Sequence, residues 1–159
     1  MKRFTDFRTL LKEADSNNGR IGGYVGLSRM YLKELPEFLK DIKIVGIFDC
    51  SDNLLTSLKN SPKIIKGGFY CNNNNLTSLE YGPIEVNGEY RAWFNHLTSL
   101  KGSPEMVRSN FDISYNRLTS LEHCPKEVGG SFYCYNNNNE FTIKDVESVC
   151  KVVGSIFLS

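Results

Sequence analysis

The 159-residue sequence has few of the features that mark membrane, secreted and disulfide-bonded proteins. It contains no run of 18 apolar residues, so no segment predicts a membrane-spanning helix, and we expect no membrane partner. Its first residues, MKRFTDFRTLLKEADSNN, lack the apolar stretch and small-residue cleavage site of a secretory signal, which predicts a cytoplasmic protein. Five cysteines, an odd number, favour reduced thiols over a disulfide framework.

The sequence also has few histidines and a small net charge. Only His96 and His123 occur, and neither stands at a spacing typical of a metal site or of a nucleophile with its base. We therefore expect no catalytic residue, no metal and no cofactor. The formal net charge of +1 does not indicate a nucleic-acid partner. With 40% hydrophobic and 23% charged residues, the composition is that of one ordinary globular domain.

The sequence is instead rich in self-similarity, with a period of 21 residues. The letters LTSL return at 55–58, 76–79, 97–100 and 118–121. An aromatic column keeps the same step: Phe48, Phe69, Tyr90, Phe111 and Phe132. So does an aliphatic column: Ile44, Ile65, Val86, Val107 and Val128. A divergent first repeat begins near Val25, and the array stops at about residue 140.

Two runs of four asparagines, at 72–75 and 136–139, arise where columns of the repeat meet. One asparagine of each run belongs to a column that we predict to be a structural ladder: Asn53, Asn74, Asn95, Asn116 and Asn137. A side-chain amide in this column can satisfy backbone groups that would otherwise be buried unpaired at a turn. Polar bias of the prion-like kind extends over longer segments, so we do not interpret the runs in that way.

The alternation around each aromatic residue predicts one short strand per repeat, with Phe48 and Cys50 inward and Asp49 and Ser51 outward. Strands repeated in the same register stack in parallel, and neighbouring repeats close a common core. Twenty-one residues leave little room for a helix on the return path, where proline and glycine favour turns or 3₁₀ pieces. The sequence therefore predicts a repeat solenoid with a parallel sheet of about six strands.

The pattern F-x-C-x-x-N-x-L-x-x-L resembles the leucine-rich repeat family from about Val25 to Asn139. The short, proline-bearing units resemble those of bacterial leucine-rich effectors. The wording "LTSLKGSPEMV…FDISYNRLTSLEHCPKEVGGSFYCYNN" is similar to small bacteriophage and bacterial proteins of unknown function. The resemblance implies a concave strand face, a convex return side and the cytoplasm of a bacterial or infected host cell, and it brings no known activity.

We expect a single domain over residues 1–159, with helical caps at both ends because a repeat array exposes an apolar face at each terminus. The N-terminal cap helix lies in 1–22, six repeats fill 23–140, and a cap helix and tail fill 141–159. Apolar residues at helical spacing support the first helix in 4–14: Phe4, Phe7, Leu10 and Leu11. The second is expected to begin after Thr142, stop at Gly154 and bury one face: Val146, Val149, Cys150 and Val153. The final SIFLS is expected to be extended.

The outward positions of the strands form a variable face that escapes the constraints of the repeat. Seven candidates for partner binding gather there: Tyr70, Arg91, Trp93, Phe94, Tyr115, Tyr133 and Tyr135. Aromatic residues with arginine are enriched in protein interface hot spots, and an exposed Trp93 calls for an explanation. We predict a non-enzymatic module that binds another protein on its concave face, with a host protein as the partner if the phage resemblance holds.

Other interpretations remain open at this point. The aromatic residues could simply pack on one another along the rim as cross-strand neighbours. They could instead stack the bases of a single-stranded nucleic acid or a nucleotide, but Asp49, Asp52 and Asp112 share the face, with few arginines to meet phosphates. An enzyme of unrecognised type lacks any convergent set of acid, base and nucleophile.

Overall fold

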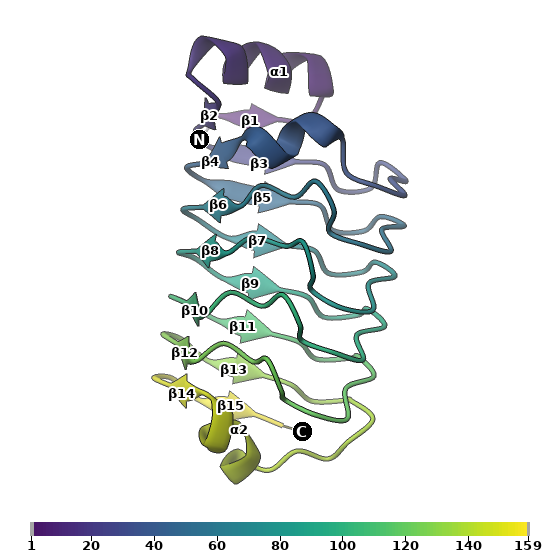
Figure 1. Cartoon of the computed structure of the whole chain (residues 1–159), viewed down its shortest axis with the longest axis vertical. Coiled ribbons are helices and arrows are strands. Elements are labelled where there is room, and N and C mark those ends of the chain that lie inside the picture. Colours follow the sequence, from purple (N-terminus) through teal and green to yellow (C-terminus); the bar gives the residue numbers. More distant parts are fainter. Residues whose placement is uncertain (1, 159) are drawn as a thin grey trace.

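In the computed structural model, which describes residues 2–158, the chain winds into a solenoid in which each repeat makes one coil (Figure 1). Every coil contributes one short strand to each of two parallel sheets. The larger sheet has eight strands: β1 Arg3–Phe4, β3 Tyr24–Gly26, β5 Ile47–Asp49, β7 Phe69–Tyr70, β9 Tyr90–Arg91, β11 Phe111–Asp112, β13 Phe132–Tyr133 and β15 Ile156–Phe157. The other has seven: β2 Arg20–Ile21, β4 Lys43–Ile44, β6 Ile64–Ile65, β8 Glu85–Val86, β10 Met106–Val107, β12 Glu127–Val128 and β14 Lys151–Val152.

The repeat solenoid is confirmed. We predicted one sheet of about six strands, whereas the structure has two sheets, of eight and seven strands. The six predicted strands are present as β3 to β13 of the larger sheet, and β1 and β15 extend it at either end. The second sheet forms because the 21-residue step also brings the aliphatic column into register. Backbone N–H groups then donate to the carbonyls of the preceding coil, as Lys66 does to Ile44 at 2.8 Å. The single 3₁₀ helix in residues 2–158 is η1 Glu37–Asp41, in the coil that holds β3 and β4.

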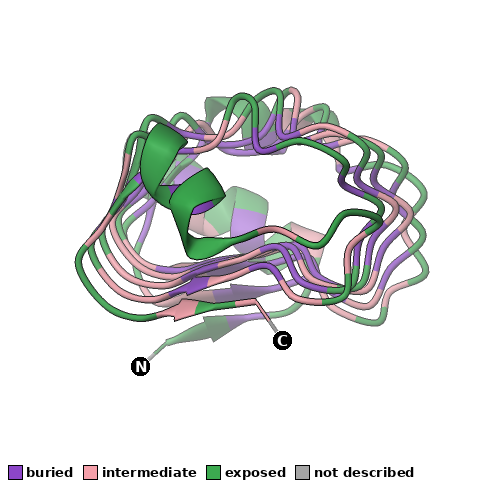
Figure 2. Ribbon diagram, turned by 90° about the horizontal axis from the view of Figure 1, so that it is seen from below, coloured by how far each residue is buried: buried purple, intermediate pink, exposed green. Residues whose placement is uncertain are grey.

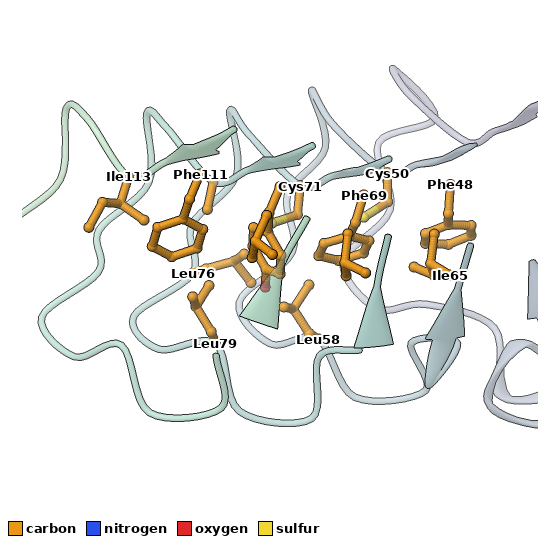
Figure 3. Packing of buried hydrophobic residues seen from close by; sticks show 14 of the residues in the cluster. Phe48, Cys50, Leu58, Ile65, Phe69, Cys71, Leu76, Leu79, Phe111 and Ile113 are labelled. Atoms are coloured by element: carbon orange, nitrogen blue, oxygen red, sulfur yellow. The ribbon is translucent and has the colours of Figure 1, made fainter. Parts of the chain in front are cut away.

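The core fills the inside of the coils, where the aromatic column and the LTSL leucines meet (Figures 2 and 3). Phe48 and Phe69 stack in parallel with ring centroids 6.1 Å apart, and Tyr90 stands edge-on to Phe69 at 5.0 Å. All members of this column are fully buried, as are the cysteines Cys50 and Cys71. Burial of large apolar side chains between adjacent coils supplies the main stabilisation of such a repeat array.

Successive coils approach each other closely at a glycine column beside the second sheet. A Cβ added to Gly67 would stand 2.4 Å from the carbonyl oxygen of Gly46, and one added to Gly46 would overlap the backbone of Gly23. Real Cβ atoms do not approach other atoms this closely. Glycine at these positions therefore follows from backbone contact between coils rather than from turn conformation, and Ser109 is the one exception between Gly46 and Gly130.

A helix lies over each end of the solenoid (Figure 1). α1 Phe7–Ser16 buries Leu10 and Ala14 and begins at Asp6, whose carboxylate accepts a hydrogen bond from the Thr9 N–H at 2.8 Å. Phe4 was predicted to belong to this helix, but it is buried in strand β1. It lies in a strand because residues 3–4 pair with residues 24–25 of β3.

α2 Ile143–Val149 begins at Thr142 as predicted, with a capping box formed by Thr142 and Asp145. The helix ends earlier than predicted, because residues 151–152 pair with β12 as strand β14. Val146 and Cys150 are buried, whereas Val149 and Val153 of the predicted apolar face are exposed. The final residues extend the larger sheet as β15, so the predicted extended tail is present.

Candidate protein-binding face

The asparagine column fixes the backbone after five strands of the larger sheet, β5, β7, β9, β11 and β13. The Asn95 side chain donates to the carbonyl oxygens of Cys71 and Ala92, both at 3.1 Å, and accepts from the Leu76 N–H at 3.0 Å. The other four asparagines make the equivalent bonds between one coil and the coil before it. These bonds satisfy buried backbone groups and hold the turn that follows each strand.

The residues that precede the five asparagines adopt a left-handed backbone conformation, as does Arg29, which precedes Met30 at the matching position of the first repeat. The φ values lie between 50° and 59° at six positions: Arg29, Asp52, Asn73, Phe94, Tyr115 and Asn136. Asparagine and aspartate tolerate this region, but bulky side chains do so at an energetic cost. Phe94 and Tyr115 are therefore strained positions, and their rings are 48% and 39% exposed. Because these side chains sit on strained backbone and remain exposed at the rim, they contribute little to the core.

An unbroken row of rings runs along these turns over three coils. Phe94 and Tyr115 stack in parallel with centroids 4.2 Å apart. Trp93 stands edge-to-face against Phe94 at 5.4 Å, and Tyr135 does the same against Tyr115 at 5.3 Å. Contact with Phe94 leaves Trp93 half-buried, so the most exposed rings are those of Phe94 and Tyr115, contrary to the expectation for Trp93.

The remaining candidates lie on the strands beside this row. The Arg91 guanidinium lies over the Tyr70 ring at 4.5 Å from its centroid and forms an ion pair with Glu89 at 2.7 Å. Tyr133 stacks in parallel on Phe157 at 4.6 Å. We call the whole surface the aromatic face, and it comprises Tyr70, Arg91, Trp93, Phe94, Tyr115, Tyr133, Tyr135 and Phe157. All seven predicted residues thus share one surface of the larger sheet.

Sequence reasoning missed Phe157, because β15 follows the last repeat at a spacing of 24 instead of 21 residues. Its register with Tyr133 would have been visible in an alignment that allowed three extra residues in the final coil. Glu89 was missed for a different reason. Its position immediately precedes the aromatic column and differs in every repeat, so no pattern marked it as the ion-pair partner of Arg91.

Two aspartates of this sheet are poorly hydrated. Asp49 is buried and accepts a hydrogen bond from the Tyr24 hydroxyl. Burial, and the hydrogen bond to Asp49, raise the pKa of Tyr24 to about 12. Burial also raises the pKa of the Asp112 carboxyl, and the nearby Glu89 carboxylate adds to the rise, whereas the N–H and hydroxyl of Ser114 and the charge of Arg91 act in the opposite direction.

Groups that could perform chemistry are not gathered at the aromatic face. Within residues 2–158, no group of three or more histidine, cysteine, aspartate or glutamate side chains is placed to hold a metal ion. Burial raises the pKa of the Cys50, Cys71 and Cys134 thiols, which disfavours the nucleophilic thiolate. No helix in the described part of the chain is long and apolar enough to cross a bilayer.

No family model matches the chain, and no curated protein sequence is significantly similar to it. The geometry of the solenoid and of its aromatic face therefore carries the functional argument.

Proposed function

We propose that the protein is a non-enzymatic, leucine-rich repeat-type module that binds another protein through the aromatic face. The observation that carries the proposal is the row of rings formed by Trp93, Phe94, Tyr115 and Tyr135, in which Phe94 and Tyr115 are exposed and the other two half-buried. Aromatic rings of this kind supply large contact areas with few rotatable bonds, which is why they are enriched in protein interface hot spots.

Backbone strain supports the same proposal. At the equivalent turn positions, Asn73 and Asn136 adopt the left-handed conformation at low cost. Phe94 and Tyr115 adopt it at higher cost, and neither ring is covered by the fold. Strained backbone clusters at binding and catalytic sites, although Tyr31 and Tyr81 share the left-handed conformation with still more exposed side chains, so the strain supports the proposal only together with the row of rings.

The orientation of the rings favours a protein over a nucleic acid. A nucleobase stacks on an open ring face. Phe94 and Tyr115 cover one face of each other, as do Tyr133 and Phe157, so ring edges form much of what a partner would meet. Glu89 also pairs with Arg91, which removes one of the few cations that could meet a phosphate.

The repeat architecture supports assignment to the leucine-rich repeat type, with α1 and α2 as caps. Each coil joins a strand to an asparagine ladder and a leucine-lined return, and the buried residues of each helix face the end of the core. A bacterial or phage origin, a cytoplasmic location and a host protein as the target extend the proposal further, and these follow from the sequence resemblance alone.

The test is affinity capture from bacterial lysate with three baits, at low and high salt, followed by mass spectrometry. The baits are the wild type, the double variant Trp93→Ala with Tyr135→Ala, and a control, Tyr81→Ala, whose ring is 62% exposed away from the aromatic face. We expect one protein to be retained by the wild type and the control at both salt concentrations and to be lost by the double variant.

Thermal unfolding of each bait must accompany the capture. The half-buried position of Trp93 and Tyr135 predicts that the double variant remains folded, so lost capture with a retained transition supports the proposal. Equal capture by all three baits would refute the aromatic face as the binding surface. If only nucleic acid is captured and salt releases it, the result would refute a protein partner and support binding of a single strand by stacking on the rings.

A further inference from the structure

The tripeptide Asp-x-Ser occurs twice on the larger sheet, as Asp49-Cys50-Ser51 on β5 and as Asp112-Ile113-Ser114 on β11. The two copies share their local geometry, because the serine N–H donates to the aspartate Oδ1 at 3.0 Å in both. They occupy the same columns three coils apart. One copy can therefore serve as an internal reference for the other.

In the first copy, both carboxylate oxygens of Asp49 accept hydrogen bonds from the protein. The Ser51 hydroxyl donates to Asp49 Oδ1 at 2.6 Å, and the Tyr24 hydroxyl on the preceding coil donates to Asp49 Oδ2. Both donors belong to the protein, and Asp49 is only 8% exposed. This copy is a closed structural cluster.

The second copy is open. The column that supplies Tyr24 to the first copy supplies Glu89 to the second, and Glu89 is an acid that pairs with Arg91. Among residues 2–158, no side chain donates a hydrogen bond to Asp112 Oδ2. The Ser114 hydroxyl is fully buried beside the Asp112 carboxylate, but it makes no hydrogen bond of normal geometry in the same part of the chain. Unpaired buried hydroxyls are rare in folded proteins and require an explanation.

Aromatic rings border this open copy. In the register of the larger sheet, Ser114 lies between Trp93 on the preceding coil and Tyr135 on the following one, which explains its burial on an outward-facing position. Asp112 lies between Arg91 and Tyr133. A carboxylate beside several rings offers both a counter-ion and π faces, the combination that binds organic cations in proteins.

We propose that Asp112 and Ser114, bordered by Trp93, Tyr133 and Tyr135, form the site on the aromatic face that receives a lysine or arginine side chain of the protein partner. The inference rests on the proposed protein-binding function and names the chemistry at its centre. The cationic head donates to Asp112 Oδ2, the position that the Tyr24 hydroxyl takes at Asp49 in the closed copy, while Ser114 lies buried beneath the site. The aliphatic stem packs along the rings.

The sole tryptophan of the sequence, Trp93, provides a direct optical probe of this site. Three amides are titrated while Trp93 fluorescence and the NMR shift of the Ser114 N–H are recorded: Nα-acetyl-lysine methylamide, Nα-acetyl-arginine methylamide and neutral Nα-acetyl-norleucine methylamide. We expect saturable shifts with the two cationic amides and weaker ones with norleucine. Preference between lysine and arginine then identifies the side chain.

The variant Asp112→Asn keeps the size of the side chain and removes its charge, and we expect it to weaken binding of the cationic amides roughly tenfold. The matched control is Asp49→Asn in the closed copy, with Asp52→Asn as a second control on the same sheet should the first fail to fold. Neither control is expected to change the dissociation constants. Equal binding of cationic and neutral amides, or unchanged binding by Asp112→Asn, would overturn the proposal.

The affinity capture described above separates this inference from the proposed function. If the partner is lost by the aromatic double variant but fully retained by Asp112→Asn, the protein-binding proposal stands and the cation site is refuted. If the partner is retained by both variants, the aromatic face is not the binding surface. A partner lost by both, together with weakened amide binding, supports the two proposals jointly.

Discussion

Replacing Tyr90 by phenylalanine should stabilise the protein. Tyr90 is fully buried in the aromatic column, between Phe69 at 5.0 Å and Phe111 at 5.4 Å, and its hydroxyl has no hydrogen-bond partner within residues 2–158. The hydroxyl extends toward Gly82, where a Cβ would stand 3.4 Å from it. In the neighbouring coils the equivalents of Gly82 carry side chains, and the aromatic residue is phenylalanine: Ser61 with Phe69, Ser103 with Phe111 and Cys124 with Phe132.

The expected magnitude follows from two opposing terms. An unpaired buried hydroxyl costs about 1–3 kcal/mol. Removing one oxygen atom leaves a void on the order of 10 Å³, which costs about 0.2–0.4 kcal/mol. The net gain for Tyr90→Phe is therefore about 0.6–2.8 kcal/mol in the free energy of unfolding, or roughly 1–11 °C in Tm for a domain of this size.

Urea denaturation followed by circular dichroism measures this gain, with Tyr24→Phe as the matched control. The same atom is removed in the control, but the Tyr24 hydroxyl donates to Asp49, so the control should lose stability. Opposite signs for the two variants are the expected result. A loss of 1 kcal/mol or more in Tyr90→Phe would show that its hydroxyl has a partner, such as an internal water, and would refute the reasoning.

Three further predictions concern the ladder, the glycine column and pH. Asn95→Ala leaves several buried backbone groups unpaired and should cost about 3 kcal/mol or more in urea unfolding, whereas Asn137→Ala, at the half-buried end of the ladder, should cost less. Gly67→Ala places a Cβ against the Gly46 carbonyl and should cost about 2 kcal/mol or more in the free energy of unfolding. The control Gly22→Ala has no atom within 4 Å of its Cβ and should leave Tm within about 2 °C of the wild type. Equal losses of stability in the two variants would contradict the argument from close approach of the coils. The pKa of Tyr24 is about 12 in the folded state against an ordinary value of 10, so its hydrogen bond stabilises the protein below pH 10 and is lost as the pH rises toward 12. The stability difference between the wild type and Tyr24→Phe should therefore shrink between pH 9 and pH 11.5, and a constant difference would count against this pKa.

Much of the fold could be predicted because the repeat is strict. A column at a fixed step, such as the one that contains Phe69, determines where each strand begins and which side chains point inward. The second sheet could not be predicted, because its strands are two residues long and carry no alternation of their own. The aliphatic column was interpreted only as core. The strands β1 and β15 lie outside the period, so the sequence predicted a helix at Phe4 and no sheet register for Phe157.

The candidate site was predictable as a surface but not as an arrangement. Outward positions follow from strand alternation, which accounts for Tyr70, Arg91, Trp93, Tyr133 and Tyr135 but not for Phe94 and Tyr115, which lie in the turns after β9 and β11. The left-handed turns at Phe94 and Tyr115 could not be predicted from those residues, since aromatic side chains rarely adopt this conformation. The difference between Asp49 and Asp112 was equally hidden, because it arises on the preceding coil, where Tyr24 in one place is replaced by Glu89 in the other.

The strand order of the larger sheet, in which each coil contacts only its neighbours in sequence, also determines how the molecule yields to force. A load applied to the two termini acts along the stack and peels the terminal coil while the others keep their bonds. Each released coil of 21 residues frees roughly 70 Å of extended chain. The protein should therefore lengthen under tension as a staircase of small, nearly equal steps, and retract in the same increments when the tension falls.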